Sequence, residues 1–310
     1  MKSKLLVTGY SGFVGGHLID HLGDAFELNL LGRKASSQGK VYKSNIDATS
    51  DYSDALNGVE VVIHSAARVH VMNDDAAEPL EAFRAVNTAG TLNLARQAAD
   101  AGVKRFIFVS TIKVNGEKTS GRSAFSSTDE SKPEDPYGIS KAEAESQLRS
   151  LSAQTGMEVV IIRPPLVYGR GVKANFASLM KCVGKGFPLP FRLINKNKRS
   201  LVSVYNLVDL IETCISHPMA ANQVFLVSDD HDVSTAEMIA LMARVQGKTD
   251  YSLPVPSVLF LLAGRLLGKS DVIDRLTGSL QVDIEHTKKT LNWKPPHSIE
   301  EGFKLSANRA

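Results

Sequence analysis

Continuous apolar runs and helical apolar stripes alternate along the first half of the chain. Leu5, Leu6 and Val7 form an unbroken apolar run, as expected of a strand that is buried on both faces. From Gly12 the spacing changes to that of a helix, whose apolar side carries Val14, Leu18, Ile19 and Leu22. The chain is therefore predicted to open with a strand, a tight turn and a helix.

The same alternation continues to about residue 165. Strands are predicted over 27–32, 59–67, 105–111 and 157–165, and helices over 81–102 and 135–156. The helix over 81–102 has an apolar side made of Phe83, Val86, Leu92 and Leu94. This order predicts an α/β fold of the Rossmann type, a doubly wound parallel sheet with helices on both faces.

Beyond residue 165 the pattern is less regular, with prolines, short strands and scattered helices. We expect a smaller, mixed α/β C-terminal lobe over 166–310, with a segment near 200–229 that returns to the main sheet domain of 1–165. The stretch 222–229 has the composition of such a returning strand. Ligands of open α/β sheets bind beyond the carboxyl ends of the strands, so those ends are the place to look for a site.

Composition and charge narrow the class of protein. The 310 residues are 43% hydrophobic and 22% charged, which is ordinary for a soluble globular protein. The net charge of +3 is too small to suggest a nucleic-acid partner, although it suits an anionic small molecule. Cys182 and Cys214 make no disulfide framework, which favours reduced thiols and a cytoplasmic location. The first strand begins within five residues of Met1, so no signal peptide is expected.

One apolar stretch, PSVLFLLAGRLL at 256–267, raises the question of a membrane. It is too short to span a bilayer and Arg265 interrupts it, so no stable membrane insertion is expected. A helix packed on the body of the protein is the favoured interpretation, and peripheral membrane contact is the alternative.

Glycines follow the first strand at a spacing of three, as Gly9, Gly12 and Gly15 in VTGYSGFVGG. They let the backbone bend tightly and approach a pyrophosphate, while the following helix offers N–H groups and the positive end of its dipole. The spacing differs from the commoner G-x-G-x-x-G fingerprint. The turn predicts a nucleotide site and makes 1–165 a dinucleotide-binding domain; a glycine turn that serves packing alone is the alternative.

The most specific chemical signal is DPYGISKAEAE at 135–145. Asp135 can cap a helix that begins at Pro136, and Tyr137 and Lys141 then lie four apart on one face. A phenol titrates near about 10, but a nearby ammonium group stabilises the phenolate and lowers that pKa. Tyr137 is thereby predicted to move a proton with Lys141 as its electrostatic partner; an ordinary surface Tyr and Lys are the alternative.

A second signal stands upstream, where RFIFVST ends with Ser110 and Thr111 at the carboxyl end of a predicted strand. A hydroxyl there can bind the same substrate oxygen that Tyr137 protonates, although a turn-capping role is also common. A glycine cradle, a strand-end threonine and Y-x-x-x-K in this order are hard to obtain by accident.

With these motifs the sequence resembles the extended short-chain dehydrogenase/reductases, close to UDP-galactose 4-epimerases and related nucleotide-sugar reductases. The resemblance covers nearly the whole chain and is carried by VTGYSGFVG, HSAARV, VNTAGT, FVSTIKVNG, DPYGISK, IIRPPLVYG, KRSLVSVYNLVDL and KTLNWKPPHSIEEGF. It implies a UDP-sugar substrate, NAD or NADP as cofactor, no metal site, and a homodimer formed through helices 81–102 and 135–156.

The resemblance also implies roles for single residues. The catalytic set would be Thr111, Tyr137 and Lys141. The cofactor would be bound by Gly9, Gly12, Phe13, Val14, Gly15, Asn45, Ile46, Ala66, Ala67, Asn87, Tyr137, Lys141 and Pro164. The substrate would be met by Lys113, Asn175, Arg199 and Arg275. For the last three, a turn asparagine and solvated arginines are the alternative, and Arg199 is favoured because a forked cation suits phosphate oxygens.

The second predicted strand departs from the epimerase pattern at its end. NAD-preferring sites usually place an acidic residue there, whereas this chain has Gly32, Arg33 and Lys34. The two cations could hold a 2′-phosphate, so NADP is favoured over NAD; a pair of ordinary surface charges is the alternative.

Three functions stay open at this point. A UDP-sugar 4-epimerase is favoured by the motifs, and an NADPH-dependent 4-keto-reductase of a UDP-deoxyhexosamine by Arg33 and Lys34. A 4,6-dehydratase is not expected, because Ile112 and Lys113 stand where that relative has two carboxylates. A non-catalytic NADP-binding regulator is the third reading, and the Tyr–Lys pair argues against it.

Overall fold

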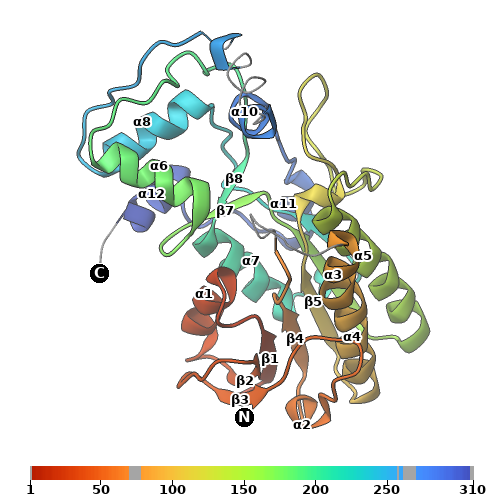
Figure 1. Ribbon diagram of the computed structural model, residues 1–310. Coiled ribbons are helices and arrows are strands. Elements are labelled where there is room, and N and C mark those ends of the chain that lie inside the picture. Colours follow the sequence, from red (N-terminus) through yellow and green to blue (C-terminus); the bar gives the residue numbers. More distant parts are fainter. Residues whose placement is uncertain (1, 70–77, 257, 261–269, 308–310) are drawn as a thin grey trace.

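Parallel strands build the larger part of the molecule, at the lower end of Figure 1. The computed structural model describes residues 2–69, 78–256, 258–260 and 270–307. Within them, a seven-stranded sheet runs in the order β3-β2-β1-β4-β5-β6-β9, with every neighbouring pair parallel. Its strands are β1 (Lys4–Thr8), β2 (Glu27–Gly32), β3 (Lys40–Lys43), β4 (Val61–His64), β5 (Arg105–Val109), β6 (Glu158–Arg163) and β9 (Val224–Leu226). The predicted α/β fold of the Rossmann type is confirmed.

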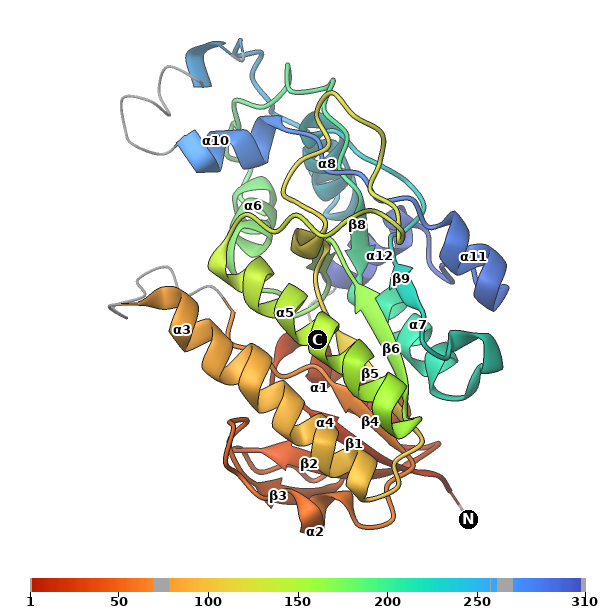
Figure 2. The same ribbon diagram turned by 90° about the vertical axis from the view of Figure 1, so that its right-hand side faces the viewer.

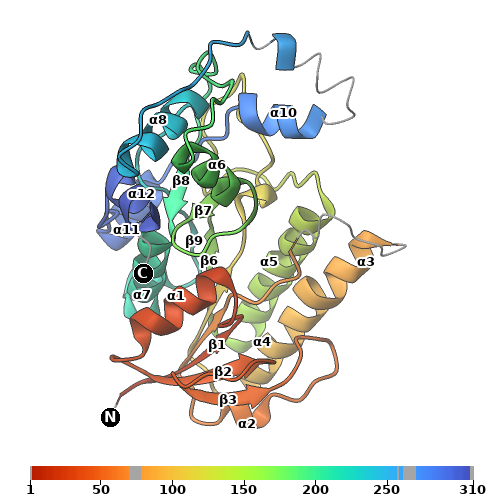
Figure 3. The same ribbon diagram turned by 60° about the vertical axis from the view of Figure 1, so that its left-hand side comes forward.

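Helices cover both faces of this sheet (Figure 3). On one face pack α1 (Phe13–Leu22) and α7 (Val204–Ser216), together with Leu5 and Val7 of β1. On the other face pack α2 (Ser53–Leu56), α4 (Thr91–Asp100) and α5 (Pro136–Thr155), together with Leu6. Successive strand residues point to opposite faces, so an unbroken apolar run fills both cores.

The helix predicted over 81–102 is present as one unbroken helical run over 79–100, but it is not α-helical throughout. It consists of α3 (Pro79–Arg84), a π-helical turn η1 (Ala85–Gly90) and α4. The wider turn buries Asn87 and Thr88 against α5, where Thr88 Oγ1 donates to the Ser140 carbonyl at 2.9 Å. π-Helical turns often mark functional sites, because they redirect side chains that a regular helix would point elsewhere.

In the first 165 residues one strand and one short helix were not predicted, and the strands β4, β5 and β6 are shorter than predicted. β3 and α2 have only four residues each, too few for a periodic pattern to stand out. The strand predicted over 59–67 is β4, which ends at His64 because the chain then turns away toward the glycine loop.

A smaller lobe lies above the sheet in Figure 1. Its two-stranded parallel sheet is β7 (Leu166–Tyr168) and β8 (Leu201–Ser203), and its helices are α6 (Ala174–Gly184), α8 (Thr235–Val245), α10 (Ser270–Thr277) and α12 (Ile299–Ala307). The rings of Tyr168, Phe176 and Phe303 pack in its core with centroids 4.7 to 5.4 Å apart. The remaining elements are α11 (Glu285–Leu291), which packs on β9, and two 3-10 turns, η2 (Ile112–Val114) and η3 (Pro218–Ala220).

In the ranges that the structure describes, no helix combines the length and the apolar character needed to cross a bilayer. The helix predicted over 256–267 falls largely outside the described residues, at Ser257 and from residue 261 onward.

Candidate active site

The glycine turn after β1 packs closely against the segment that follows β4. Gly9 has a φ of +71°, and a Cβ built on it would lie 2.6 Å from the Ala66 nitrogen. A Cβ on Gly15 would lie 2.1 Å from the Gly9 carbonyl oxygen, which also accepts from the Gly12 N–H at 2.8 Å. The helix α1 begins beside this cradle, and the N–H groups of Phe13 and Val14 lie in its first turn. Among the described residues no side chain caps this end of the helix. The arrangement fits a pyrophosphate.

The segment after β4 continues the same site. Ala66 and Ala67 follow β4 after Ser65, and Ala66 lies next to the glycine turn. Asn87 of the π-helical turn holds the next residue through two bonds: its Oδ1 accepts from the Arg68 N–H at 2.8 Å, and its Nδ2 donates to the Arg68 carbonyl at 3.0 Å. Nδ2 also donates to Ser140 Oγ on α5 at 3.0 Å. Asn87 thus ties the loop after β4 to the helix that carries the predicted catalytic pair.

The residues predicted to surround the adenosine end lie at the ends of β2 and β3. Arg33 and Lys34 are exposed just beyond β2, where the Tyr10 hydroxyl donates to the Lys34 carbonyl. Asn45 is exposed and Ile46 is half-buried beyond β3.

Thr111 and Pro164 lie beyond the neighbouring ends of β5 and β6. Both are buried, and the Ile112 N–H donates to the Pro164 carbonyl at 3.0 Å, which joins the two loops. Thr111 Oγ1 accepts a 3.3 Å bond from the Lys113 N–H at the start of η2. The turn-capping role that is the alternative for this threonine is therefore present in the structure.

The helix α5 presents the predicted Tyr–Lys pair. Asp135 caps it as predicted, with Oδ1 accepting from the Gly138 N–H at 2.7 Å. Tyr137 is half-buried in the first turn, whereas Lys141 is fully buried one turn later and its Nζ donates to the Val109 carbonyl at the end of β5 at 2.8 Å. The lysine is thus held between the helix and the carboxyl edge of the sheet.

The electrostatics of this pair correct the sequence-based expectation. Burial raises the pKa of Tyr137 to about 12, and the charge of Asp135 adds to the rise. Burial lowers the pKa of Lys141 to about 7, against the opposing field of Glu145. The predicted lowering of the phenol pKa is therefore wrong for the side chains of this chain alone, because desolvation disfavours the charged form of both groups.

A buried histidine lies behind the lysine and was not predicted. His64, the last residue of β4, shares hydrogen bonds with Thr8 Oγ1 at 2.7 Å and with Thr91 Oγ1 at 2.9 Å. Burial, with a smaller contribution from the charge of Lys141, lowers the pKa of His64 to about 3. A neutral imidazole therefore joins β1, β4 and α4 beneath the site.

This histidine predicts how stability depends on pH. Between about pH 6.5 and 3 the unfolded chain takes up a proton on His64 that the folded chain does not, so the free energy of unfolding should fall as pH drops below 6.5. The slope approaches about 1.4 kcal/mol per pH unit. Urea unfolding at pH 7, 6 and 5 measures it. His64→Gln should flatten the slope, and His21→Gln, at an exposed histidine, should preserve it; equal slopes in all three proteins would contradict this assignment.

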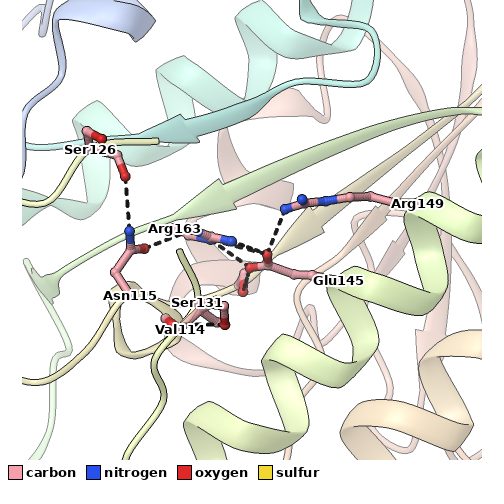
Figure 4. A network of polar contacts seen from close by, with 8 residues as sticks. Val114, Asn115, Ser126, Ser131, Glu145, Arg149 and Arg163 are labelled. Carbon is pink, nitrogen blue, oxygen red and sulfur yellow. Dashed lines mark hydrogen bonds and ion pairs between the residues drawn. The ribbon is translucent and has the colours of Figure 1, made fainter. Parts of the chain in front are cut away.

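A buried ionic network fixes α5 to the sheet (Figure 4). Glu145, one turn after Lys141, accepts from Arg163 of β6 at 2.9 Å on Oε1 and 2.5 Å on Oε2, and from Ser110 Oγ at 2.6 Å. Arg163 also donates to Asn115 Oδ1 at 2.9 Å. Two features of the sequence could have pointed to this network: an arginine at the end of the apolar strand EVVIIR, and a glutamate four residues after Lys141.

Lys113 was predicted to contact substrate, and its ammonium group is already paired. Nζ lies 2.9 Å from Glu117 and 2.5 Å from Asp135, the residue that caps α5. Contact with a substrate would require Lys113 to share or leave these two carboxylates.

The other predicted substrate residues belong to the second lobe. Asn175 is exposed in the first turn of α6, and Arg199 is half-buried before β8, with Nη1 donating to the Gly278 carbonyl at 3.3 Å. Arg275 lies in α10, and its side chain is outside the described part of the structure. These residues thus belong to the second lobe, whereas the predicted catalytic set belongs to the edge of the main sheet.

Comparison with known proteins places this geometry in a family. The sequence model of the NAD dependent epimerase/dehydratase family matches residues 5–228, which include the glycine turn, Thr111 and the Tyr–Lys pair. The chain belongs to this family.

Individual proteins of this kind are similar to the chain over at least 90% of its length. The chain is 56% identical to a UDP-glucose 4-epimerase of Vibrio cholerae, over 99% of this chain and 95% of that protein. It is 28% identical to the N-acetyl-α-D-glucosaminyl-diphospho-ditrans,octacis-undecaprenol 4-epimerase of Escherichia coli O157:H7, over 90% and 82%. A crystal structure of a UDP-glucose 4-epimerase with UDP-glucose from Thermotoga maritima has the same fold, with 23% identity, a TM-score of 0.77 and coverage of 98% and 97%. The chain is thus an enzyme of the short-chain dehydrogenase/reductase type.

Proposed function

We propose that this protein is a UDP-sugar 4-epimerase, which inverts C4 of a UDP-hexose or UDP-N-acetylhexosamine. The observation that carries the proposal is the 2.8 Å bond from Lys141 Nζ to the Val109 carbonyl, which holds α5, the helix of Tyr137 and Lys141, at the end of β5 where Thr111 follows. The named relatives that act on C4 of sugar nucleotides support it.

The residues at the cradle fit a dinucleotide. Gly9 and Gly15 leave no room for a Cβ, and the start of α1 supplies N–H groups to an anionic group. Bound NAD(P)⁺ would supply a hydride acceptor and a positive charge. That charge is what the phenol of Tyr137 needs, because the side chains around it leave its pKa near 12.

The chain's own residues then have distinct roles. Tyr137 accepts the C4 hydroxyl proton and later returns it, while Thr111 hydrogen-bonds the same oxygen. Lys141 is anchored on the Val109 carbonyl, so its charge stays at a fixed place behind Tyr137. Asn87 and Ser140 hold the loop after β4 against α5, which keeps the cofactor-binding and proton-transfer residues in register.

On the substrate side, we propose that Asn175 and Arg199 meet the diphosphate, with Arg275 as a further candidate. A guanidinium group offers paired donors that match phosphate oxygens. Arg199 is half-buried and tied to Val233 by two backbone bonds of 2.9 and 3.0 Å, so its side chain begins from a fixed point.

For the cofactor we propose tighter binding of NADP(H) than of NAD(H), since exposed Arg33 and Lys34 follow β2. Fluorescence titration should give Arg33→Ser/Lys34→Ser at least about tenfold weaker NADPH binding and nearly unchanged NADH binding. Equal affinities of the unaltered protein for the two cofactors would remove the proposal. Proteins of the same fold have been solved in complex with NAD, so the titration tests whether this chain differs from them in its cofactor preference.

Arg33 and Lys34 also favour a second candidate, an NADPH-dependent 4-keto-reductase of a UDP-deoxyhexosamine. A net reductase must exchange its cofactor at each turnover, and a site that selects NADPH suits that need. Incubation with UDP-sugars and 4-keto UDP-sugars, with and without NADPH, separates the two. Interconversion of epimers with only catalytic cofactor supports the epimerase; consumption of NADPH in proportion to product supports the reductase.

We further propose a homodimer through the α3–α4 and α5 helices, which lie side by side in Figure 2. The groove between them has a volume of about 630 Å³ and is lined in part by Arg84, Leu92 and Glu143. Light scattering on Leu92→Asp should show a monomer where the unaltered chain is a dimer.

A cytoplasmic location is proposed as well, because Cys182 and Cys214 are both free.

A further inference from the structure

Exposed apolar side chains gather at the outer end of the second lobe. Six large ones, each 45% to 60% exposed, form what we call the apolar tip: Phe187, Leu193, Tyr251, Leu253, Val258 and Leu259. In the described part of the chain only three others of this kind are found, at separate places: Val69, Leu166 and Met219. Such clustering is not the scatter expected of an ordinary surface.

Two segments that are far apart in the chain form the apolar tip. The first segment contains Phe187 and Leu193, and the second contains Tyr251, Leu253, Val258 and Leu259. The Leu253 N–H donates to the Leu189 carbonyl at 2.7 Å, and the Arg192 N–H donates to the Leu253 carbonyl at 3.2 Å. Beneath the tip the ring of Phe260 stacks on that of Phe191, with centroids 5.8 Å apart. Figure 1 draws the two segments alongside each other at the top of the molecule, at the opposite end from β3 and α2.

Positive charge surrounds this surface. Residues 171–200 contain seven lysines or arginines and no acidic residue, although the whole chain carries only +3. Lys185, Arg192 and Lys196 of this stretch are exposed beside the tip, as is Lys248 from the second segment. Asp250, next to Tyr251, is an acidic residue at this surface. Its Oδ1 accepts hydrogen bonds from the N–H and the hydroxyl of Ser252, at 2.9 and 2.5 Å.

Apolar side chains within a lysine- and arginine-rich rim match an anionic lipid surface. The apolar groups reach the boundary between headgroups and acyl chains, and the cations pair with lipid phosphates.

We propose that the apolar tip and its basic rim dock this enzyme reversibly on an anionic membrane surface. The catalytic edge of the sheet belongs to the other lobe and stays in water while the tip is bound. The docking does not depend on the reaction proposed above, because none of its residues belongs to the catalytic set.

Sedimentation of the full chain with vesicles tests this. Vesicles of phosphatidylcholine with about 30% phosphatidylglycerol should bind the protein, vesicles of phosphatidylcholine alone should not, and binding should weaken several-fold between 50 and 300 mM salt because the rim contribution is screened. Phe187→Ser/Leu253→Ser should lose at least about tenfold in vesicle affinity. Met219→Ser, which alters an exposed apolar residue elsewhere, should bind as the unaltered chain does.

The controls keep the proposal falsifiable. The double variant should unfold at the same temperature as the unaltered chain, which separates lost docking from lost folding. Absence of binding to the anionic vesicles, or equal binding by the double variant, would overturn the proposal. So would a lipid-free self-association that disappears in the double variant, since a second copy of the chain would then cover the tip.

Discussion

Tyr137→Phe is expected to lower kcat by a factor of about 10² to 10⁴ while cofactor affinity changes little. The substitution removes one phenol oxygen from the first turn of α5 and leaves Asp135 as the helix cap. No other change is required, because the half-buried ring keeps its place beside Phe83, 6.1 Å away between centroids. Steady-state kinetics with a UDP-sugar, together with NAD(P)H titration, measure both quantities.

Tyr251→Phe is the matched control, since it removes the same atom from an exposed tyrosine of the second lobe. Its kcat should equal that of the unaltered protein. A Tyr137→Phe protein with full activity would exclude the proposed proton route.

Lys141→Met should also abolish turnover, but its effect on folding should be small or favourable. The lysine is buried with a pKa lowered to about 7, so folding works against its charge, and methionine fills a similar volume without that cost. An inactive but stable protein would support an electrostatic role for Lys141.

Arg163→Met is expected to destabilise the protein by about 3–5 kcal/mol, because it leaves the carboxylate of Glu145 buried without its main partner. Urea unfolding followed by circular dichroism measures this. Arg149→Met is the control: Arg149 contacts the same carboxylate at 3.2 Å but is half exposed, so its loss should cost less than about 1 kcal/mol.

A double variant tests the physical reason for that difference. Glu145→Leu/Arg163→Met removes both charges and should recover most of the lost stability, because an apolar pair of similar volume needs no compensation. If Arg163→Met cost no more than Arg149→Met, the network in Figure 4 would not hold α5 in place.

The sheet was predictable from the sequence because several of its strands consist of unbroken apolar runs. β1, β5 and β6 have both faces covered, so nearly every residue in LLV, RFIFV and EVVII is apolar or buried. The second lobe and β3 lack this pattern, since their short strands take their partners from tertiary packing and not from local sequence.

The places of the candidate residues in the fold were predictable from the sequence, and their electrostatics were not. Tyr137, Lys141 and Thr111 occupy the edge of the sheet where the motifs put them. The predicted direction of the phenol pKa was wrong because burial, which a sequence does not display, raises it together with the charge of Asp135, and the same burial lowers the pKa of Lys141. The π-helical turn was not predicted either. It accompanies tertiary contacts of Asn87 and Thr88 with α5, which the local sequence does not display.

The most direct test of the epimerase account follows one atom of the substrate. UDP-glucose labelled with deuterium at C4 is incubated with the protein and catalytic cofactor, and the label in the product is measured by mass spectrometry and NMR. Because epimerisation removes and returns the same hydride within one site, UDP-galactose should form and keep its deuterium at C4. Product whose C4 deuterium has been lost, or no product unless reduced cofactor is consumed in equal amount, would contradict the account.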